Sequence, residues 1–255
     1  MRTTILAIHA HPDDVEILAG GTLAHLAAGG HQVVVVSMTP GDCGSRDRTP
    51  EEIADIRRAE AAASARRIGA TYRCAEFRDL AIFNDNRSRR RVTELLRSVQ
   101  PDVVITASPV DYMCDHETTS TLVRDACFGA SAPNYTTAAI SPAAPLAAIP
   151  HLYFMDSIGG VDREERPVIA DFYVDIEAQF ETKRAMLAEH ASQREWLLAQ
   201  HGMDDYLLTM ESWTREAGRR GGVALGEGFR QYKGHPYPAK PLLQELLGSL
   251  VRLPI

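Results

Sequence analysis

Residues 5–37 read ILAIHAHPDDVEILAGGTLAHLAAGGHQVVVVS, and this stretch decides the fold. Two short apolar runs, Ile5 to His9 and Val33 to Ser37, are typical of buried parallel strands. Between them, Val15 to Ala28 has the length of a helix, and Gly29-Gly30 can cap its C-terminus. The stretch therefore predicts a strand–helix–strand unit.

The following residues repeat this alternation. Thr49 can cap a second helix, Pro50 suits its first position and Glu52 completes a capping box. This helix should end at Gly69. The next elements are a strand at Tyr72–Phe77, a helix at Ser88–Val99 and a strand at Asp102–Ala107. Right-handed crossovers turn such a series into an α/β fold with an open, mostly parallel sheet and helices on both faces.

The pattern changes beyond Cys127. Further elements are expected as a surface loop or partial lid at Ala138–Pro150, strands at Leu152–Met155 and Val168–Val174, and one long helical stretch at Ile176–Gln200. Trp196 and Trp213 are interpreted as core or interface anchors. No linker or internal repeat is visible, so we expect one domain over residues 1–255. Residues 1–130 would form the parallel core, and residues 131–255 would complete it.

Composition limits the class of protein. A chain of 255 residues with 45% hydrophobic residues can bury a continuous core. Its 27 basic and 34 acidic residues give a net charge of −7, which argues against a nucleic-acid surface and favours a small-molecule partner. The sequence leaves open whether the chain forms a homo-oligomer.

The expected location is the cytoplasm. We find no run of about 18 apolar residues for a membrane span and no signal-peptide core. The cysteines show no CxxC spacing and are interpreted as reduced thiols, namely Cys43, Cys74, Cys114 and Cys127.

Two polar clusters follow predicted strands. Residues 9–16, HAHPDDVE, come after the first strand, and residues 111–117, DYMCDHE, come after the fourth. If the strand order is 3-2-1-4, these two loops face each other across the topological switch point. The clusters would then converge into one site at the carboxyl ends of the strands.

The residue types in these clusters fit a zinc centre. Hydrolytic zinc usually takes three ligands from His, Asp or Glu, and His11, Asp14 and His116 supply that set. Pro12 fixes a turn, so Asp13 is free to act as general base toward a water whose pKa zinc lowers. Helix capping by the two aspartates would leave the histidines unexplained. His9 lies on the strand itself, and we do not expect it to be a ligand.

The motif resembles that of the LmbE-like, or PIG-L, family of zinc-dependent N-acetylglucosaminyl deacetylases and amidases. The similar residues are His11-Pro12-Asp13-Asp14 with Glu16, Gly20-Gly21-Thr22-Leu23, Thr39-Pro40-Gly41-Asp42, Arg57-Arg58-Ala59-Glu60 and Asp115-His116. The resemblance covers about the first 130 residues.

Membership would imply a Rossmann-like fold, one Zn²⁺ per chain held by His11, Asp14 and His116, and Asp13 as base. Arg57 is similar to the family's substrate-contacting arginine, and Asp79 to the acidic residue that meets sugar hydroxyls. Asp115 is expected to orient a ligand imidazole or a neighbouring backbone group.

One departure from the family pattern affects the mechanism. Many members have His-Pro-Asp-His where this chain has Met113-Cys114-Asp115-His116, and Met113 cannot transfer a proton. The acid role would then fall to another group, or the chemistry would tolerate its absence. The candidates for this acid role are Tyr112, His151, His235 and a zinc-bound water.

The site favours a metal-dependent hydrolase of linear amide C–N bonds that removes an N-acyl group, expected to be acetyl. The resemblance to the family implies that the substrate is an amino sugar or sugar conjugate. One alternative is an amidase that cleaves a thiol-sugar conjugate, and another is a metal-binding member that has lost catalysis. A nucleotide-binding module is disfavoured because no GxGxxG or GxxxxGK[ST] follows the first strand. Ligand type alone does not separate zinc from iron or cobalt.

Overall fold

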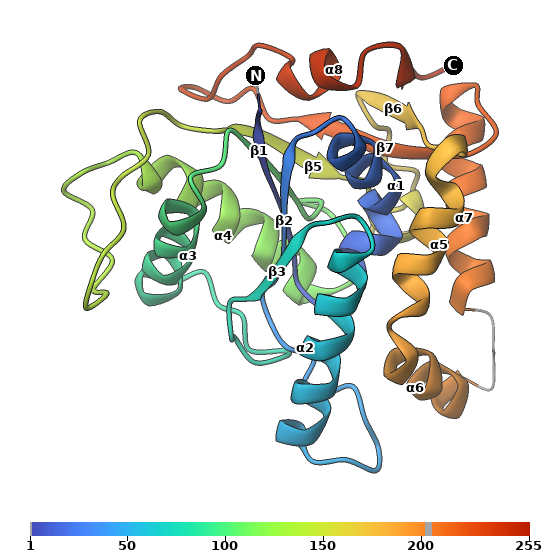
Figure 1. Ribbon diagram of the computed structural model, residues 1–255, viewed down its shortest axis with the longest axis horizontal. Coiled ribbons are helices and arrows are strands. Elements are labelled where there is room, and N and C mark those ends of the chain that lie inside the picture. Colours follow the sequence, from blue (N-terminus) through green and yellow to red (C-terminus); the bar gives the residue numbers. More distant parts are fainter. Residues whose placement is uncertain (1, 202–205) are drawn as a thin grey trace.

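The computed structural model describes residues 2–201 and 206–255 (Figure 1). Within these residues, eight strands form one sheet in the order β3-β2-β1-β4-β5-β7-β6-β8. The strands are β1 Thr4–His9, β2 Gln32–Ser37, β3 Thr71–Cys74, β4 Val103–Thr106, β5 His151–Met155, β6 Phe172–Asp175, β7 Gly226–Gln231 and β8 Val251–Arg252. The helices are α1 Asp14–Ala28, α2 Pro50–Arg66, α3 Asn86–Val99, α4 Cys114–Ala130, α5 Phe180–Ala188, α6 Ala191–His201, α7 Tyr206–Gly221 and α8 Leu242–Leu247. Three short 3-10 helices are η1 Ile158–Gly160, η2 Glu177–Gln179 and η3 Gly248–Leu250.

The α/β class with a mostly parallel sheet is confirmed, and the first four strands have the order 3-2-1-4 that the convergence of the two clusters required. β1 pairs in parallel with both β2 and β4, and β5 continues the parallel part beyond β4. β7 then pairs antiparallel with β5 and β6, and β8 pairs antiparallel with β6. The topological switch point therefore lies between β1 and β4, where the sequence predicted a site.

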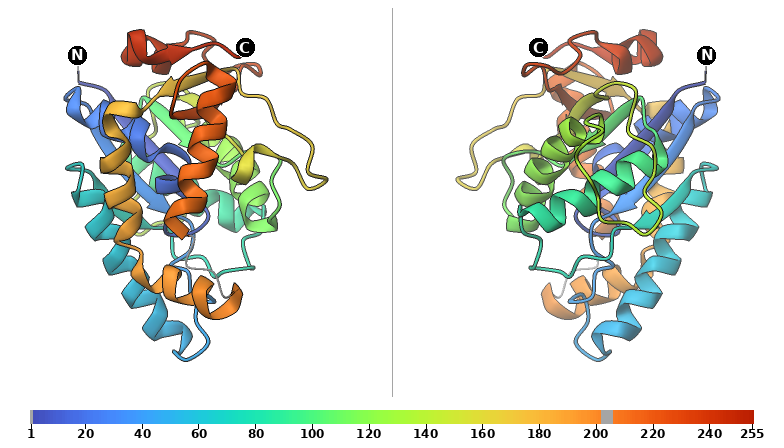
Figure 2. Two further views of the ribbon diagram at one scale, coloured as in Figure 1. Left: turned by 90° about the vertical axis from the view of Figure 1, so that its right-hand side faces the viewer. Right: turned by 90° about the vertical axis from the view of Figure 1, so that its left-hand side faces the viewer.

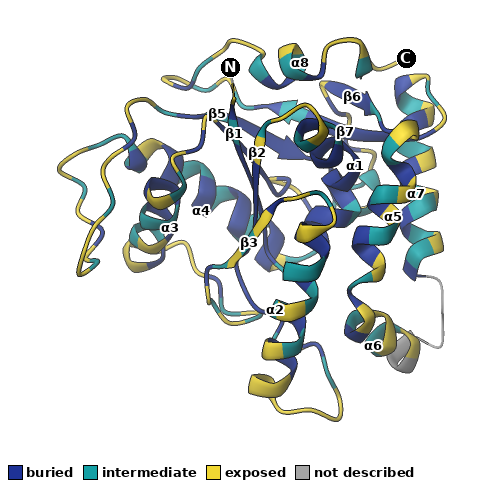
Figure 3. Ribbon diagram, in the orientation of Figure 1, coloured by how far each residue is buried: buried dark blue, intermediate teal, exposed yellow. Residues whose placement is uncertain are grey.

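Helices cover both faces of the sheet, and the alternation along β1 shows how. Ile5 and Ala7 pack with apolar residues of α1, α5 and α7, whereas Leu6 and Ile8 pack with those of α3 and α4. Figure 1 shows these two groups of helices on opposite sides of the strands. Figure 3 shows that β1, β2 and β5 are almost wholly buried, whereas the edge strand β3 is partly exposed. Burial on both faces explains why the strands are continuous apolar runs.

The prediction of one long helical stretch at Ile176–Gln200 was wrong. The structure has η2, α5 and α6 there, with a break at His190. At this break His190 is fully buried, and its Nε2 lies 3.2 Å from Glu16 Oε1. β3 is shorter than predicted, and β6 starts only at Phe172. No element was predicted from the sequence at the positions of α4, α7, β7, α8 and β8.

A buried ion pair ties the C-terminal half to α1. Glu227 on β7 accepts hydrogen bonds from Lys183 Nζ at 2.7 Å and, within α1, from Gly21 N at 2.9 Å and Thr22 N at 2.7 Å. A Cβ on Gly21 would lie only 2.7 Å from Cβ of Ile176, so this position requires glycine. The helix that starts at Asp14 is therefore held from the far half of the sheet.

The capping box at the start of α2 is confirmed and leads to a stability prediction. Thr49 Oγ1 accepts from Glu52 N at 3.2 Å, and Glu52 Oε2 accepts from Thr49 N at 2.9 Å. We expect Thr49→Ala to lower the free energy of unfolding by about 1 kcal/mol, because a backbone donor loses its acceptor. Urea denaturation measures this. Thr49→Ser, which keeps the hydroxyl, should stay close to wild type, and an equal loss in both variants would contradict the capping explanation.

In the described part of the chain, no helix is both long and apolar enough to cross a membrane. All four cysteines are free thiols.

Candidate metal centre and substrate pocket

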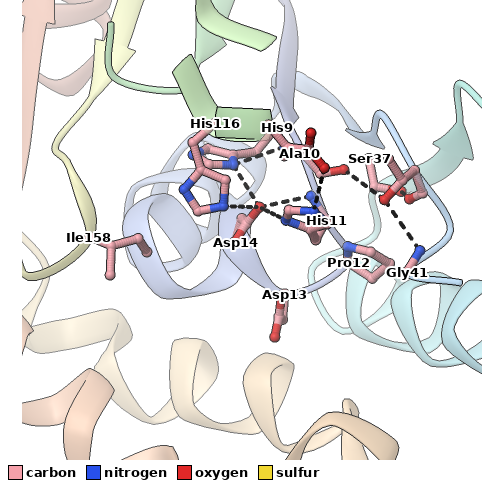
Figure 4. Close-up of polar contacts among 12 residues, drawn as sticks. His9, Ala10, His11, Pro12, Asp13, Asp14, Ser37, Gly41, His116 and Ile158 are labelled. Atoms are coloured by element: carbon pink, nitrogen blue, oxygen red, sulfur yellow. Dashed lines mark hydrogen bonds and ion pairs between the residues drawn. The ribbon is translucent and has the colours of Figure 1, made fainter. Parts of the chain in front are cut away.

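The two polar clusters meet at the carboxyl ends of β1 and β4. His9 is the last residue of β1 and Asp14 the first of α1, while His116 lies in the first turn of α4. Figure 4 shows the imidazoles of His9, His11 and His116 arranged around the carboxylate of Asp14. The structure thus brings together the three residues predicted as ligands, with His9 beside them.

The distances around Asp14 separate two kinds of neighbour. From Asp14 Oδ2, His11 Nδ1 lies at 3.3 Å and His116 Nε2 at 3.5 Å. His9 Nδ1 is closer, at 2.7 Å, and the backbone N–H of His11 donates to the same oxygen at 2.8 Å. The first pair of distances is longer than a good hydrogen bond, whereas the second pair is typical of one.

This difference bears on which residues fit a metal ion. Ligands bound at 2.0–2.1 Å in a tetrahedral zinc site lie about 3.3 Å apart. His11 and His116 stand close to that separation from Asp14, and His116 Nε2 is buried without a hydrogen-bond partner. The ligand atoms of His9, Asp14 and His116 also lie within 4.8 Å of one another, so His9 offers a second donor set with the same two partners.

The charges around the cluster favour a cation. Burial would lower the pKa of His11, yet the carboxylates of Asp115 and Asp14 raise it to about 10. Burial also disfavours the charged form of Asp14, but the imidazoles of His9 and His116 hold the pKa of this carboxyl well below its usual range. Asp115 Oδ2 lies 3.4 Å from His11 Nε2, where the sequence placed an orienting carboxylate. On His116, Asp111 plays the same part, with Oδ1 3.1 Å from Nδ1.

Asp13 faces away from this cluster. Its backbone has φ of 100°, a strained conformation for a residue other than glycine, and Figure 4 shows its side chain pointing away from the imidazoles that surround Asp14. Tyr206 donates a hydrogen bond to Asp13 Oδ2 at 2.6 Å, and Arg57 Nη2 lies 3.7 Å from Oδ1. Burial raises the pKa of Asp13, although Arg57 and Tyr206 oppose the shift. The two adjacent aspartates therefore have pKa values shifted in opposite directions, as in an acid–base site.

A cavity of about 500 Å³ opens beside both aspartates. Its walls come from both halves of the chain. They comprise His11, Asp13, Asp14, Ile17, Cys43, Gly44, Arg57, Asp79, Leu80, Tyr112, Met113, His116, Ile158, Gln193, Trp196, Leu197, Tyr206, Thr209 and Trp213. A pocket of this size, mostly apolar with a few convergent polar groups, suits a small-molecule substrate.

The two residues predicted to bind substrate line this pocket. Arg57 is buried and donates to Pro12 O at 2.8 Å, and a Cβ on Gly41 would lie 2.3 Å from its guanidinium. Its visible contacts thus position the loop that carries Asp13. Asp79 Oδ2 accepts from Cys43 N at 2.9 Å, while its Oδ1 is buried with no partner.

The candidates for the acid role are separated by position. Tyr112 lines the pocket, with its ring edge-on to His116 at 5.4 Å between centroids. His151 is the first residue of β5, at the opposite end of the parallel strands, and His235 lines a different surface cavity. Neither belongs to the pocket wall, so Tyr112 is the side chain of this set that can reach a bound substrate.

Several pocket residues were missed from the sequence. Trp196 and Trp213 were interpreted as core or interface anchors, but both line the pocket, as do Gln193 and Tyr206. Their spacing was a usable signal: Gln193, Trp196 and Leu197 share one face of α6, and Tyr206, Thr209 and Trp213 share one face of α7. Figure 2 shows α6 at the end of the molecule where α2 begins.

Comparison with known proteins identifies relatives of this arrangement. A family model described as PIG-L, GlcNAc-PI de-N-acetylase, matches residues 6–127. The N,N'-diacetylchitobiose deacetylase of Pyrococcus horikoshii superposes with a TM-score of 0.77 at 27% identity, covering 94% of this chain and 88% of that one.

Two curated relatives point to different reactions. A 4-oxalmesaconate hydratase of Pseudomonas putida is 28% identical over 196 residues, 74% of this chain and 73% of the relative. A 1D-myo-inositol 2-acetamido-2-deoxy-alpha-D-glucopyranoside deacetylase of Saccharopolyspora erythraea is 46% identical over 74 residues, 29% of this chain and 22% of the relative. The chain thus aligns with less than a quarter of that deacetylase's length.

Proposed function

We propose, from the premise that this chain belongs to the PIG-L (LmbE-like) family, that it is a zinc-dependent hydrolase which removes an N-acyl group, acetyl in the first instance, from an amino sugar or sugar conjugate. Its homologues include deacetylases that act on N-acetylated sugars. The observation that carries the proposal is the pair of adjacent aspartates: Asp14 faces three imidazoles, and Asp13 faces the substrate cavity.

In the proposed hydrolysis, each residue of the site has a distinct role. His11, Asp14 and His116 would hold the zinc ion, which when bound would act as a Lewis acid and lower the pKa of water. Asp13 accepts the proton of the water that attacks the amide carbonyl. Oδ2 of Asp13 already accepts from Tyr206, and its Oδ1 lies 3.7 Å from Arg57 Nη2. Arg57 keeps this carboxylate in place through its contacts with Asp13 and Pro12.

A substrate panel tests the proposal. Zinc-loaded protein should release acetate from at least one N-acetylated glycoside, and acetate can be measured by a coupled assay. Amides of thiol-sugar conjugates belong in the same panel, because amidase action on them is the nearest alternative. If no amide in either set is hydrolysed by metal-loaded protein, the proposed function is wrong.

Hydration of an unsaturated acid is a second candidate, favoured by the hydratase that aligns over most of its length. The pocket argues against it. Among the described lining residues, Arg57 is the one Lys or Arg, and its guanidinium is engaged with Asp13 and Pro12, while three aspartates line the same cavity. Apart from the bound zinc ion, the described pocket would then offer no free Lys or Arg side chain to a substrate with several carboxylates. Measuring hydration of 4-oxalmesaconate beside the amide panel separates the two reactions.

Tyr112 gives a third test. We expect Tyr112→Phe to lower kcat by about 10- to 100-fold, because a hydrogen bond from its hydroxyl to a charged reacting group would be lost. Met113→Leu is the matched control and should leave kcat close to wild type, since neither side chain donates a proton. Steady-state kinetics on the best amide of the panel measures both. Equal losses in the two variants would contradict the role of Tyr112.

We also propose that residues 1–255 form one domain. β5 and β7 are paired strands of one sheet, although β5 follows the parallel half and β7 belongs to the C-terminal half. The Lys183–Glu227 pair and its bonds to α1 support the same conclusion.

A further inference from the structure

The pocket contains buried polar atoms whose hydrogen bonds are not made by the protein. In the part of the chain that the structure describes, Arg57 Nε, Asp79 Oδ1 and Gln193 Oε1 lack any hydrogen-bond partner, and all three side chains line the cavity. A buried polar atom without a partner is costly, and folded proteins seldom keep several of them together. Their partners are therefore expected to come from the bound substrate.

The chemistry of these atoms limits what the substrate can be. Asp79 Oδ1 and Gln193 Oε1 are acceptors, so each requires a donor, whereas Arg57 Nε requires an acceptor. A hydroxyl group can serve as both donor and acceptor, so a polyhydroxylated ring meets all three requirements. An ionised polycarboxylate offers only acceptors and would leave Asp79 and Gln193 unpaired.

Gln193 is held firmly at the pocket wall. Its neighbour Ser192 donates to Glu60 of α2 through its backbone N at 2.9 Å and through Oγ at 2.6 Å, which anchors the start of α6. A Cβ on Gly44 would lie 3.5 Å from Gln193 Oε1 and 2.7 Å from Arg57 Nη1, so this glycine leaves room for both polar side chains. The start of the helix that carries Gln193 is thus anchored, and Gly44 leaves room for its amide oxygen beside Arg57.

Further along the same helix face, the pocket wall becomes apolar. Trp196 and Leu197 follow Gln193 at the spacing that places side chains on one face of a helix. A sugar ring has hydroxyls around its edge and an apolar face of C–H groups. The face of α6 therefore matches such a ring with one polar and two apolar contacts.

We propose that Gln193 accepts a hydrogen bond from a ring hydroxyl of the sugar substrate and thereby selects for that hydroxyl, with Trp196 against the ring face. This inference rests on the proposed function, because it assigns the substrate of the same site. It adds a specificity-determining residue from the C-terminal half, outside residues 6–127 that match the family model.

The test combines variants of Gln193 with substrates that lack one hydroxyl. The probes are the N-acetylated sugar that wild type hydrolyses best and its monodeoxy analogues, each measured as kcat/KM. Gln193→Met removes the acceptor at similar size, and Gln193→Glu keeps an acceptor. Glu195→Gln on the same helix, where the side chain is 72% exposed, is the control.

We expect wild type to lose about tenfold in kcat/KM, mainly through KM, on one of the analogues. Gln193→Met should lose a similar factor on the parent sugar and nothing further on that analogue, whereas Gln193→Glu and Glu195→Gln should still discriminate. Equal losses of Gln193→Met on every sugar, or a wild type indifferent to each missing hydroxyl, would overturn the inference alone. If wild type hydrolyses no sugar of the panel, the proposed function fails and this inference with it. Should Gln193→Met not fold, the wild-type and Gln193→Glu series still decide, because both must discriminate.

Discussion

Replacing Asp13 with Asn is expected to lower kcat by about 10²- to 10⁴-fold while the protein keeps its metal. The amide cannot accept the proton of the attacking water, yet it has the same shape as the carboxylate. Asn also tolerates positive φ better than most residues, so the backbone at φ of 100° should persist. Turnover on the best amide of the panel, together with metal content by elemental analysis, gives the two numbers required.

The control for this prediction is a variant that removes the hydrogen bond from Tyr206 to Asp13. Tyr206→Phe removes the donor to Asp13 Oδ2 but leaves a carboxylate able to accept a proton, so its loss of kcat should be clearly smaller. Both variants should unfold at temperatures near that of wild type. Full activity of Asp13→Asn would refute Asp13 as the base, and loss of metal in this variant would show that Asp13 supports the metal site instead.

Removal of a ligand imidazole should have the second large effect. We expect His11→Ala and His116→Ala each to weaken zinc binding by more than about 100-fold, which is the upper range for residues that only orient a ligand. Activity should fall with metal content. In contrast, His9→Gln should weaken binding by less, because His9 lies at hydrogen-bonding distance from Asp14 rather than at the distance between two ligands.

Competition with a chromophoric chelator measures these affinities. The comparison is informative because His9, Asp14 and His116 also form a compact set. If His9→Gln lost zinc as completely as His116→Ala while His11→Ala retained it, the third ligand would be His9. Thermal unfolding of the three variants without metal separates loss of a ligand from loss of the fold.

The parallel half of the sheet could be predicted because its signals are local. Apolar strands end in polar loops, and the capping box at Thr49 marks where α2 begins. β7 could not be predicted in this way, because its sequence, GEGFRQ, has little strand propensity. It becomes a strand through pairing with β5 and β6 and through the contacts of Glu227. The break at His190 likewise depends on a distant partner, Glu16.

The same division applies to the candidate site. His11, Asp14 and His116 stand out because imidazoles and carboxylates crowd the ends of two neighbouring strands. The direction of Asp13 does not follow from that pattern, since it depends on the turn at Pro12 and on Tyr206. Gln193 and Trp196 carry no motif, and only the placement of α6 beside α2 turns them toward the cavity.

The hydrogen bonds that Glu227 accepts from Gly21 and Thr22 have a consequence for which parts of the chain can change in sequence. The loop that carries Asp13 and Asp14 leads directly into α1, and β7 holds this helix through Glu227, so α6 does not set the position of the loop. Helix α6 can exchange its pocket-facing residues without loosening the aspartates, whereas Tyr206 of α7 is hydrogen-bonded to Asp13. On the proposed function, α6 can therefore change in substrate selectivity while the two aspartates keep their positions.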